Sequence, residues 1–496
     1  MRKDGQPATF HVATLGCKIN QYESEAISEA WTAQGLSEAE DPRKADVLLV
    51  NSCAVTGRAV SDLRASVRRL RQQNPGARIV VTGCAAQVLE AELAAMPEVD
   101  AVVPQARKGD LLGPFGPFGP FGGEKADASV AGHRARPAEL SAESSTGSLA
   151  GSLAECRAEG RDGAAPEAGA CTVPAAPATE ARVFPPFSIA AFNRARAVVK
   201  VQDGCSHRCT YCIVPLTRGP SVSRDPAEVL AEMRRLLAAG YRELVLSGVN
   251  LRQYGADLAE PLDFWDLLAR AETELTPEWA GRARLRLSSV EPGQLAAKAV
   301  DVLGGSRLVA PHLHLSLQSG DAGVLRRMGR GHYKPEQVLD GLNALRRHWP
   351  RFGLGADLLT GFPGETAEQF ETTCAFCREL PLTYAHVFPY SPRPGTPAAS
   401  LPDPLPKVER TARAARLRAL AESKKRAFQN ELAALPGLTV LVENAETGQG
   451  VCEYYAACQV RPAAGGAGLR AGALMRMRPR GVVQGRVVGA AVEDDA

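Results

Sequence analysis

The sequence lacks long apolar runs, a leader-like N-terminus and a marked excess of charge of either sign. No stretch of about 18 consecutive apolar residues occurs, so no membrane-spanning helix is predicted. The first residues, MRKDGQPATF, contain no apolar segment and no small-residue cleavage site, so no secretory signal is predicted. The formal net charge of +3 does not by itself indicate a partner. These absences together predict a cytoplasmic protein.

Cysteine is not scarce, and the predicted compartment decides how it is interpreted. The chain has 12 cysteines among 496 residues. In a reducing cytosol disulfides are rare, and grouped cysteines more often bind metal or take part in chemistry.

Hydrophobic residues make up 45% of the chain, an ordinary value for a globular protein with real cores. At roughly 150 residues per domain, the length suggests about three domains.

Residues 1–106 predict a small α/β domain. Strand-like apolar runs alternate with amphipathic helical patterns, and the runs are Thr9–Thr14, Ala45–Val50, Arg78–Thr82 and Val99–Val103. Strands separated by helices favour a small parallel sheet whose two faces are covered.

Residues 107–190 differ in composition from the rest of the chain. The tripeptide GPF occurs three times between Gly113 and Phe121, and Ala, Gly, Ser, Pro and Glu dominate the residues after these repeats. The few large apolar side chains cannot offset the entropy lost on ordering, so this low-complexity segment predicts a disordered linker. Its cysteines, Cys156 and Cys171, are then expected to be loose thiols without a partner.

Residues 191–431 predict a larger α/β domain of six strand–helix units. The strand candidates are Ala197–Val201, Glu243–Leu246, Arg284–Leu287, His312–Leu317, Leu354–Leu359 and Tyr384–Phe388. Such a series favours a partial (βα)6 barrel or a complete α/β barrel. In either, the active site lies at the C-terminal ends of the strands.

Residues 432–496 predict a small all-β barrel, preceded by a long basic helix over Lys407–Asn430. The β-like runs are Leu438–Glu443, Val451–Val460, Ala473–Met477 and Val482–Val492. Arginines gather on the helix at Arg410, Arg413 and Arg416, and in the barrel at Arg470, Arg476, Arg478, Arg480 and Arg486. Basic stripes are often plain solvated surface. Two of them beside a small β-barrel favour contacts with RNA phosphates.

The spacing C-x3-C-x2-C of Cys205, Cys209 and Cys212 is the most specific motif in the chain. Three thiolates on one short loop can cap three irons of a 4Fe–4S cube and leave the fourth iron without a protein ligand. The alternative, a structural zinc site, needs a fourth Cys or His. His207 could supply a nitrogen, although it lies within the loop.

A second set of cysteines is dispersed along the chain but follows one rule. Cys17, Cys53 and Cys84 each come just after a predicted parallel strand of the first domain. The C-terminal ends of such strands meet at one edge of the sheet, so the three thiols can converge on a second cluster with an open iron. Each cysteine could instead be a small buried packing residue.

The remaining cysteines have no companion ligands nearby. Cys374 and Cys377 form a C-x2-C on a predicted helix, and Cys452 and Cys458 lie in the predicted C-terminal barrel. We expect all four to be packing residues.

With both sets placed, most of the chain resembles the radical S-adenosylmethionine (SAM) methylthiotransferase family. ATLGCKINQYESE, VNSCAVT and VTGCAAQ resemble its N-terminal domain. QDGCSHRCTYCIVPLTRG, LSGVNLRQYG, RLSSVEP, HLHLSLQSGD and GFPGE resemble its radical SAM domain. The final segment resembles the TRAM domain, a small β-barrel that binds RNA. Gly113–Pro185 departs from this pattern.

The resemblance implies two 4Fe–4S clusters and S-adenosyl-L-methionine as cofactors. SAM would chelate the open iron at Cys205, Cys209 and Cys212, and one electron would cleave it to a 5′-deoxyadenosyl radical. The cluster at Cys17, Cys53 and Cys84 would carry the sulfur that is transferred. Tyr211 matches an aromatic position near the SAM adenine, or is a plain loop aromatic. Further SAM contacts are expected at Gly248, Asn250, Ser289, Glu291 and Gln318, although Asn250 and Gln318 could be structural polar groups.

Within the family, TLGCKINQYESE, RLSSVEP and HVFPYSPRPGTPA are similar to the branch that acts on threonylcarbamoyladenosine in tRNA. That similarity implies 2-methylthiolation of the base at position 37 in the anticodon loop, with an electron donor such as flavodoxin or ferredoxin. The alternatives are the branches that act on isopentenyladenosine in tRNA or on a ribosomal protein. A non-catalytic, metal-stabilised RNA-binding protein is the alternative from another class.

Overall fold

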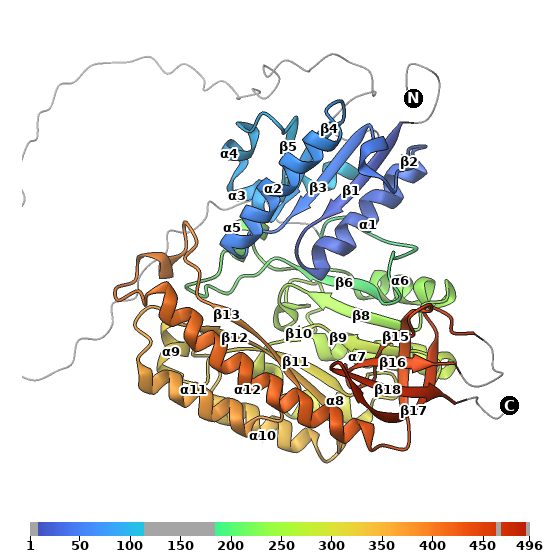
Figure 1. Ribbon diagram of the computed structural model, residues 1–496, viewed down its shortest axis with the longest axis vertical. Coiled ribbons are helices and arrows are strands. Elements are labelled where there is room, and N and C mark those ends of the chain that lie inside the picture. Colours follow the sequence, from blue (N-terminus) through green and yellow to red (C-terminus); the bar gives the residue numbers. More distant parts are fainter. Residues whose placement is uncertain (1–7, 114–183, 463–467, 493–496) are drawn as a thin grey trace, which may run out of the picture.

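The computed structural model describes residues 8–113, 184–462 and 468–492 in three folded parts (Figure 1). Cys156 and Cys171 lie outside these residues. Both ends of the expected linker belong to the fold, since η2 spans Gln105–Leu112 and Ile189 donates its backbone N–H to Glu232. No helix in the described ranges is long and apolar enough to cross a membrane.

The N-terminal part is a five-stranded parallel sheet, as the sequence predicts. Its strand order is β2-β1-β3-β4-β5. The strands are β1 (Thr9–Thr14), β2 (Ser37–Glu38), β3 (Val47–Ser52), β4 (Arg78–Gly83) and β5 (Ala101–Pro104). The helices are α1 (Lys18–Ala33), α2 (Gly57–Gln73), α3 (Cys84–Val88) and α4 (Glu90–Ala94). Every residue of the central strand β3 is buried, because helices cover both faces of the sheet.

The central part is the predicted partial barrel, built from two four-stranded sheets. Their orders are β7-β6-β8-β9 and β10-β11-β12-β13, and a parallel bridge between Leu285 and Val309 links β9 to the chain before β11. The strands are β6 (Ala197–Asp203), β7 (Val222–Ser223), β8 (Glu243–Gly248), β9 (Arg284–Leu287), β10 (Ser289–Val290), β11 (His312–Gln318), β12 (Gly353–Thr360) and β13 (Tyr384–Pro389). The third predicted strand therefore continues, after a break at Ser288, into the short β10.

The helices of the central part follow its strands in alternation. They are α5 (Val214–Arg218), α6 (Pro226–Ala238), α7 (Phe264–Trp279), α8 (Ala297–Gly305), α9 (Ala322–Arg327), α10 (Pro335–Leu345), α11 (Ala367–Glu379) and α12 (Lys407–Ala433). Cys374 and Cys377 are buried in α11, as expected for packing residues.

The C-terminal part is a closed β-barrel in the order β14-β15-β16-β18-β17. Its strands are β14 (Leu438–Asn444), β15 (Gln449–Cys452), β16 (Ala457–Arg461), β17 (Leu474–Val483) and β18 (Arg486–Ala491). The predicted run Val451–Val460 is wrong as a single strand, because a turn with Tyr455 at φ +64° divides it. Cys452 and Cys458 are buried in this barrel.

The C-terminal barrel docks on the N-terminal ends of the central strands. Arg284 of β9 donates hydrogen bonds to the backbone carbonyls of Thr439 and Val451, each at 2.9 Å. Arg286 donates to those of Cys452 and Glu453, each at 3.2 Å. The N-terminal part packs on β6 and α5, which α1 and α3 contact (Figure 1).

Candidate active site

Cys205, Cys209 and Cys212 lie on the loop between β6 and α5, at the C-terminal end of the first barrel strand. The loop is pinned by its backbone: Cys205 donates to Gly219 O at 3.0 Å, and Cys212 donates to Cys209 O at 3.0 Å. Burial raises the pKa of all three thiols, that of Cys212 to about 12, and Cys209 and Cys205 add to the shift of Cys212. A bound metal would supply the positive charge that such thiols need to ionise.

Two donors from other parts of the barrel point at this cysteine loop. Asn250 Nδ2 lies 3.5 Å from Cys205 Sγ, and Arg330 Nη1 lies 3.8 Å from Cys209 Sγ. Hydrogen bonds from N–H groups to the ligating sulfurs tune an iron–sulfur cluster. The arrangement therefore fits an iron–sulfur cluster held by three thiolates.

His207 is engaged elsewhere, which bears on the zinc alternative. Its Nδ1 lies 3.4 Å from Asn250 Nδ2, and its ring packs 5.1 Å from that of His332. The structure thus gives no support to His207 as a fourth ligand of a zinc ion.

Glu291 and Arg330 form a buried ion pair next to the cysteine loop. Arg330 Nη2 donates to Glu291 Oε2 at 2.6 Å, and His332 Nε2 lies 3.4 Å from the same oxygen. Although burial opposes ionisation, His332 and Arg330 hold the pKa of Glu291 below its usual value. Glu291, a predicted SAM contact, therefore orients Arg330 in this structure.

The other predicted SAM contacts all lie at the same end of the barrel. Tyr211 packs, partly buried, against a small apolar cluster that includes Met328 and Phe362. Gly248 ends β8, where a Cβ atom would come within 3.0 Å of Gln202 Oε1. Ser289 opens β10. Gln318 ends β11 with φ +65°, a strained conformation for a residue other than glycine.

Cys17, Cys53 and Cys84 come together at one edge of the N-terminal sheet. Cys17 caps the start of α1, Cys53 follows β3, and Cys84 begins α3 directly after β4. Burial raises the pKa of Cys53 to about 11, and both other thiols add to the shift. Three neighbouring thiols, of which burial would keep Cys53 protonated, again fit a bound metal cluster better than free cysteines.

A buried network of charges joins the two cysteine groups across the domain interface. Arg218, at the end of α5, donates to Asn20 Oδ1 at 2.8 Å and to Glu23 Oε1 at 2.9 Å. Asn20 Oδ1 in turn lies 3.8 Å from Cys17 Sγ. Lys108 and Lys200 also pair with Glu23, at 2.5 and 2.7 Å. Arg218 thereby connects the loop of Cys212 with the edge that holds Cys17.

Sequence patterns did not single out Arg218, Arg330 or Arg393 as site residues. Arg393 is buried, and its Nε has no partner among the described residues. Burial lowers the pKa of Arg393, and the nearby Cys53 opposes that shift. The sequence did contain a signal for this interface, because Lys200 interrupts the apolar run Ala197–Val201 and is fully buried in β6. A lysine there needs a buried acid.

The predicted basic stripe on α12 is wrong for Arg413, while Arg416 is exposed and pairs with Glu371 at 2.7 Å. Arg413 is buried and pairs with Glu365 at 2.7 Å, and Arg410 donates to the backbone carbonyl of Tyr390. These arginines hold the helix on the barrel, because their partners lie on the neighbouring loops. In the C-terminal barrel, by contrast, Arg476, Arg478 and Arg480 alternate along β17 and are all exposed.

Known families match two parts of the chain. Residues 9–104 match the model of the uncharacterized protein family UPF0004, and residues 199–377 match the radical SAM superfamily. The first match contains Cys17, Cys53 and Cys84, and the second contains Cys205, Cys209 and Cys212. A solved radical S-adenosylmethionine methyltransferase, TsrM from Kitasatospora setae, is similar with a TM-score of 0.49, at 15% identity, over 79% of this chain and 74% of that chain.

Curated relatives match most of the chain. The threonylcarbamoyladenosine tRNA methylthiotransferase MtaB of Bacillus subtilis is 34% identical over 86% of this chain and 82% of its own length. Its namesake from Rickettsia prowazekii is 32% identical over 82% and 81%. The tRNA-2-methylthio-N(6)-dimethylallyladenosine synthase of Deinococcus radiodurans is 32% identical over 83% and 71%. The chain is an enzyme that belongs to the radical SAM methylthiotransferase family.

Proposed function

We propose that this enzyme converts N6-threonylcarbamoyladenosine at position 37 of tRNA to its 2-methylthio derivative, using two 4Fe–4S clusters. The observation that carries the proposal is the pair of cysteine trios, each at the C-terminal edge of a parallel sheet, with Arg218 of the helix after Cys212 bonded to Asn20 and Glu23 of the other part. The relatives from Bacillus subtilis and Rickettsia prowazekii, both named for this substrate, support it.

The loop of Cys205, Cys209 and Cys212 holds the cluster that binds SAM. When bound, the cluster and SAM supply a carbon-centred radical, which can remove a hydrogen from a C–H bond that ordinary bases cannot deprotonate. The chain's own part is to hold the thiolates: Asn250 and Arg330 donate to sulfur, and Glu291 keeps Arg330 in place. The electron comes from outside the chain, from a donor such as flavodoxin or ferredoxin.

Cys17, Cys53 and Cys84 would hold the second cluster, which would supply the sulfur. The Arg393 guanidinium lies near Cys53 without an acid partner among the described residues, so it can balance the negative charge of the thiolates. The exposed arginines of β17 contact phosphates of the tRNA, and the target base leaves its loop to reach the barrel.

Nucleoside mass spectrometry tests the proposed reaction. We expect tRNA from a strain without this gene to lack 2-methylthio-threonylcarbamoyladenosine, and the gene on a plasmid to restore it. Purified anaerobically, the protein should be brown and contain about eight irons per chain. An unchanged nucleoside level in the deletion strain would refute the substrate, and a colourless protein would favour the non-catalytic RNA-binding alternative.

The same measurement distinguishes the proposed substrate from a second candidate, isopentenyladenosine in tRNA. The Deinococcus radiodurans relative, named for dimethylallyladenosine, is nearly as similar as the relatives named for threonylcarbamoyladenosine. If the 2-methylthio derivative of isopentenyladenosine disappears instead, the chain acts in that branch. Loss of a methylthio group from a ribosomal protein, with unchanged tRNA, would indicate the third branch.

A further inference from the structure

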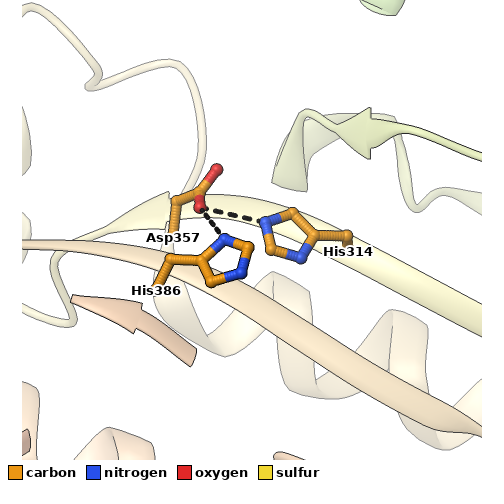
Figure 2. A group of neighbouring side chains, drawn as sticks. All are labelled: His314, Asp357 and His386. Atoms are coloured by element: carbon orange, nitrogen blue, oxygen red, sulfur yellow. Dashed lines mark hydrogen bonds and ion pairs between the residues drawn. The ribbon is translucent and has the colours of Figure 1, made fainter. Parts of the chain in front are cut away.

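Three adjacent barrel strands carry a polar group that the proposed reaction does not use. His314 lies on β11, Asp357 on β12 and His386 on β13, and the three side chains point toward one another (Figure 2). Asp357 and His386 are direct partners in the parallel pairing of β12 with β13. One possible ligand atom from each residue lies within 4.8 Å of the other two.

The two imidazoles meet at one carboxylate oxygen. His314 Nε2 lies 3.0 Å from Asp357 Oδ1, and His386 Nδ1 lies 3.2 Å from the same atom. Although burial opposes ionisation, the two histidines hold the pKa of Asp357 well below its usual range, so the carboxylate is charged at neutral pH. The group therefore offers one negative oxygen and two nitrogens.

A second layer of side chains fixes the orientation of His314. Tyr384 Oη lies 3.0 Å from His314 Nδ1 and 2.9 Å from His312 Nε2. Because the Tyr384 hydroxyl is hydrogen-bonded to Nδ1 of His314, the other ring nitrogen, Nε2, faces the Asp357 carboxylate. A histidine whose far nitrogen is hydrogen-bonded in this way is the usual form of a metal ligand.

We propose that His314, Asp357 and His386 bind one divalent transition-metal ion, zinc or ferrous iron, separate from the two iron–sulfur clusters. Two histidines and one carboxylate are a common ligand set for both ions, and such sites leave coordination positions open for water or another oxygen ligand. The side-chain exposure rises from 8% at His314 through 23% at Asp357 to 57% at His386, so an ion can enter from the His386 side.

Zinc is the better probe, because cluster iron does not contribute to its count. The reconstituted protein, with its cluster cysteines occupied, is incubated anaerobically with zinc, desalted and analysed for both metals. We expect about one zinc per chain. Its X-ray absorption spectrum should show nitrogen and oxygen ligands at about 2.0–2.1 Å and no sulfur at about 2.3 Å.

Variants locate the ion. Asp357→Asn and His386→Ala should lose the retained zinc, and Tyr384→Phe should weaken binding by roughly 10–100-fold. His348→Ala, at an exposed histidine on the chain after α10, should bind as the wild type does. An unchanged iron count in every variant shows that the fold and the clusters survive.

Two results would overturn the site. One is a wild-type protein that retains no more zinc than Asp357→Asn, which would leave a hydrogen-bonded triad without a metal. The other is zinc with sulfur ligands, which would place the ion on cysteines. Neither result depends on tRNA modification, so the proposed function is tested separately.

Discussion

At the scale of single residues, the two cysteine trios predict separable defects. Cys209→Ala removes one of the three cysteines proposed to hold the SAM-binding cluster, so we expect both SAM cleavage and methylthio transfer to vanish. Cys17→Ala leaves that loop intact, so the protein should still form 5′-deoxyadenosine but transfer no sulfur. Chromatography of 5′-deoxyadenosine and mass spectrometry of the tRNA product measure the two activities side by side.

Cys374→Ala is the matched control, since Cys374 is buried in α11 among apolar side chains. It should retain both activities. Retained SAM cleavage in Cys209→Ala would contradict the role of the C-x3-C-x2-C loop. Loss of cleavage in Cys17→Ala would contradict separate roles for the two trios.

At the scale of elements, the junction between β4 and α3 determines where Cys84 lies. Gly83 has φ +98°, and a Cβ atom there would overlap the backbone carbonyl of Ser52 on the neighbouring strand. Gly83→Ala should therefore cost about 1–3 kcal/mol in backbone strain and displace Cys84. We expect iron to fall from about eight to about four per chain, measured by metal analysis, while SAM cleavage persists.

Gly76→Ala serves as the control for this junction. Gly76 lies on the turn before β4, has no positive φ and would place its Cβ atom in open space. It should keep the full iron content. Equal iron in both variants would mean that the close approach at Gly83 does not position Cys84.

At the scale of the whole molecule, Glu243 couples the central part to the C-terminal barrel. It pairs with Arg286 at 2.7 Å and with Arg284, the two arginines that hold the C-terminal barrel. Glu243→Gln leaves both guanidinium groups buried without a carboxylate, which should cost about 3–5 kcal/mol at neutral pH. Hydrogen exchange should then speed up in β14 and β15.

This effect should depend on pH in a defined direction. Burial opposes ionisation, but Arg286 and Arg284 lower the pKa of Glu243 from 4.5 to about 2. The folded-state pKa is the lower one, so the carboxylate contributes about 3 kcal/mol above pH 4.5, and the contribution is lost as the pH falls toward 2. The stability gap between wild type and Glu243→Gln should shrink over that range in unfolding measurements.

Glu422→Gln is the control for the loss of a charge pair. Glu422 pairs with Lys425 at 3.4 Å on the exposed side of α12, and such surface pairs contribute at most about 1 kcal/mol. If Glu422→Gln lost as much stability relative to wild type as Glu243→Gln, the change in net charge, and not the buried pair, would cause the effect.

The amino-acid sequence alone determined the order of strands and helices, the two parallel architectures and the places of Cys17 and Cys205 after strands. These features come from local patterns: apolar runs, helical periodicity and short cysteine spacings. Only the tertiary structure decided which charges are buried together. Arg218 and Glu23 are 195 residues apart in the chain, and Arg413 proved to be a buried partner of Glu365 on a helix that looked like a basic surface. The burial of a charge depends on which distant acid packs against it, and no local pattern contains that information.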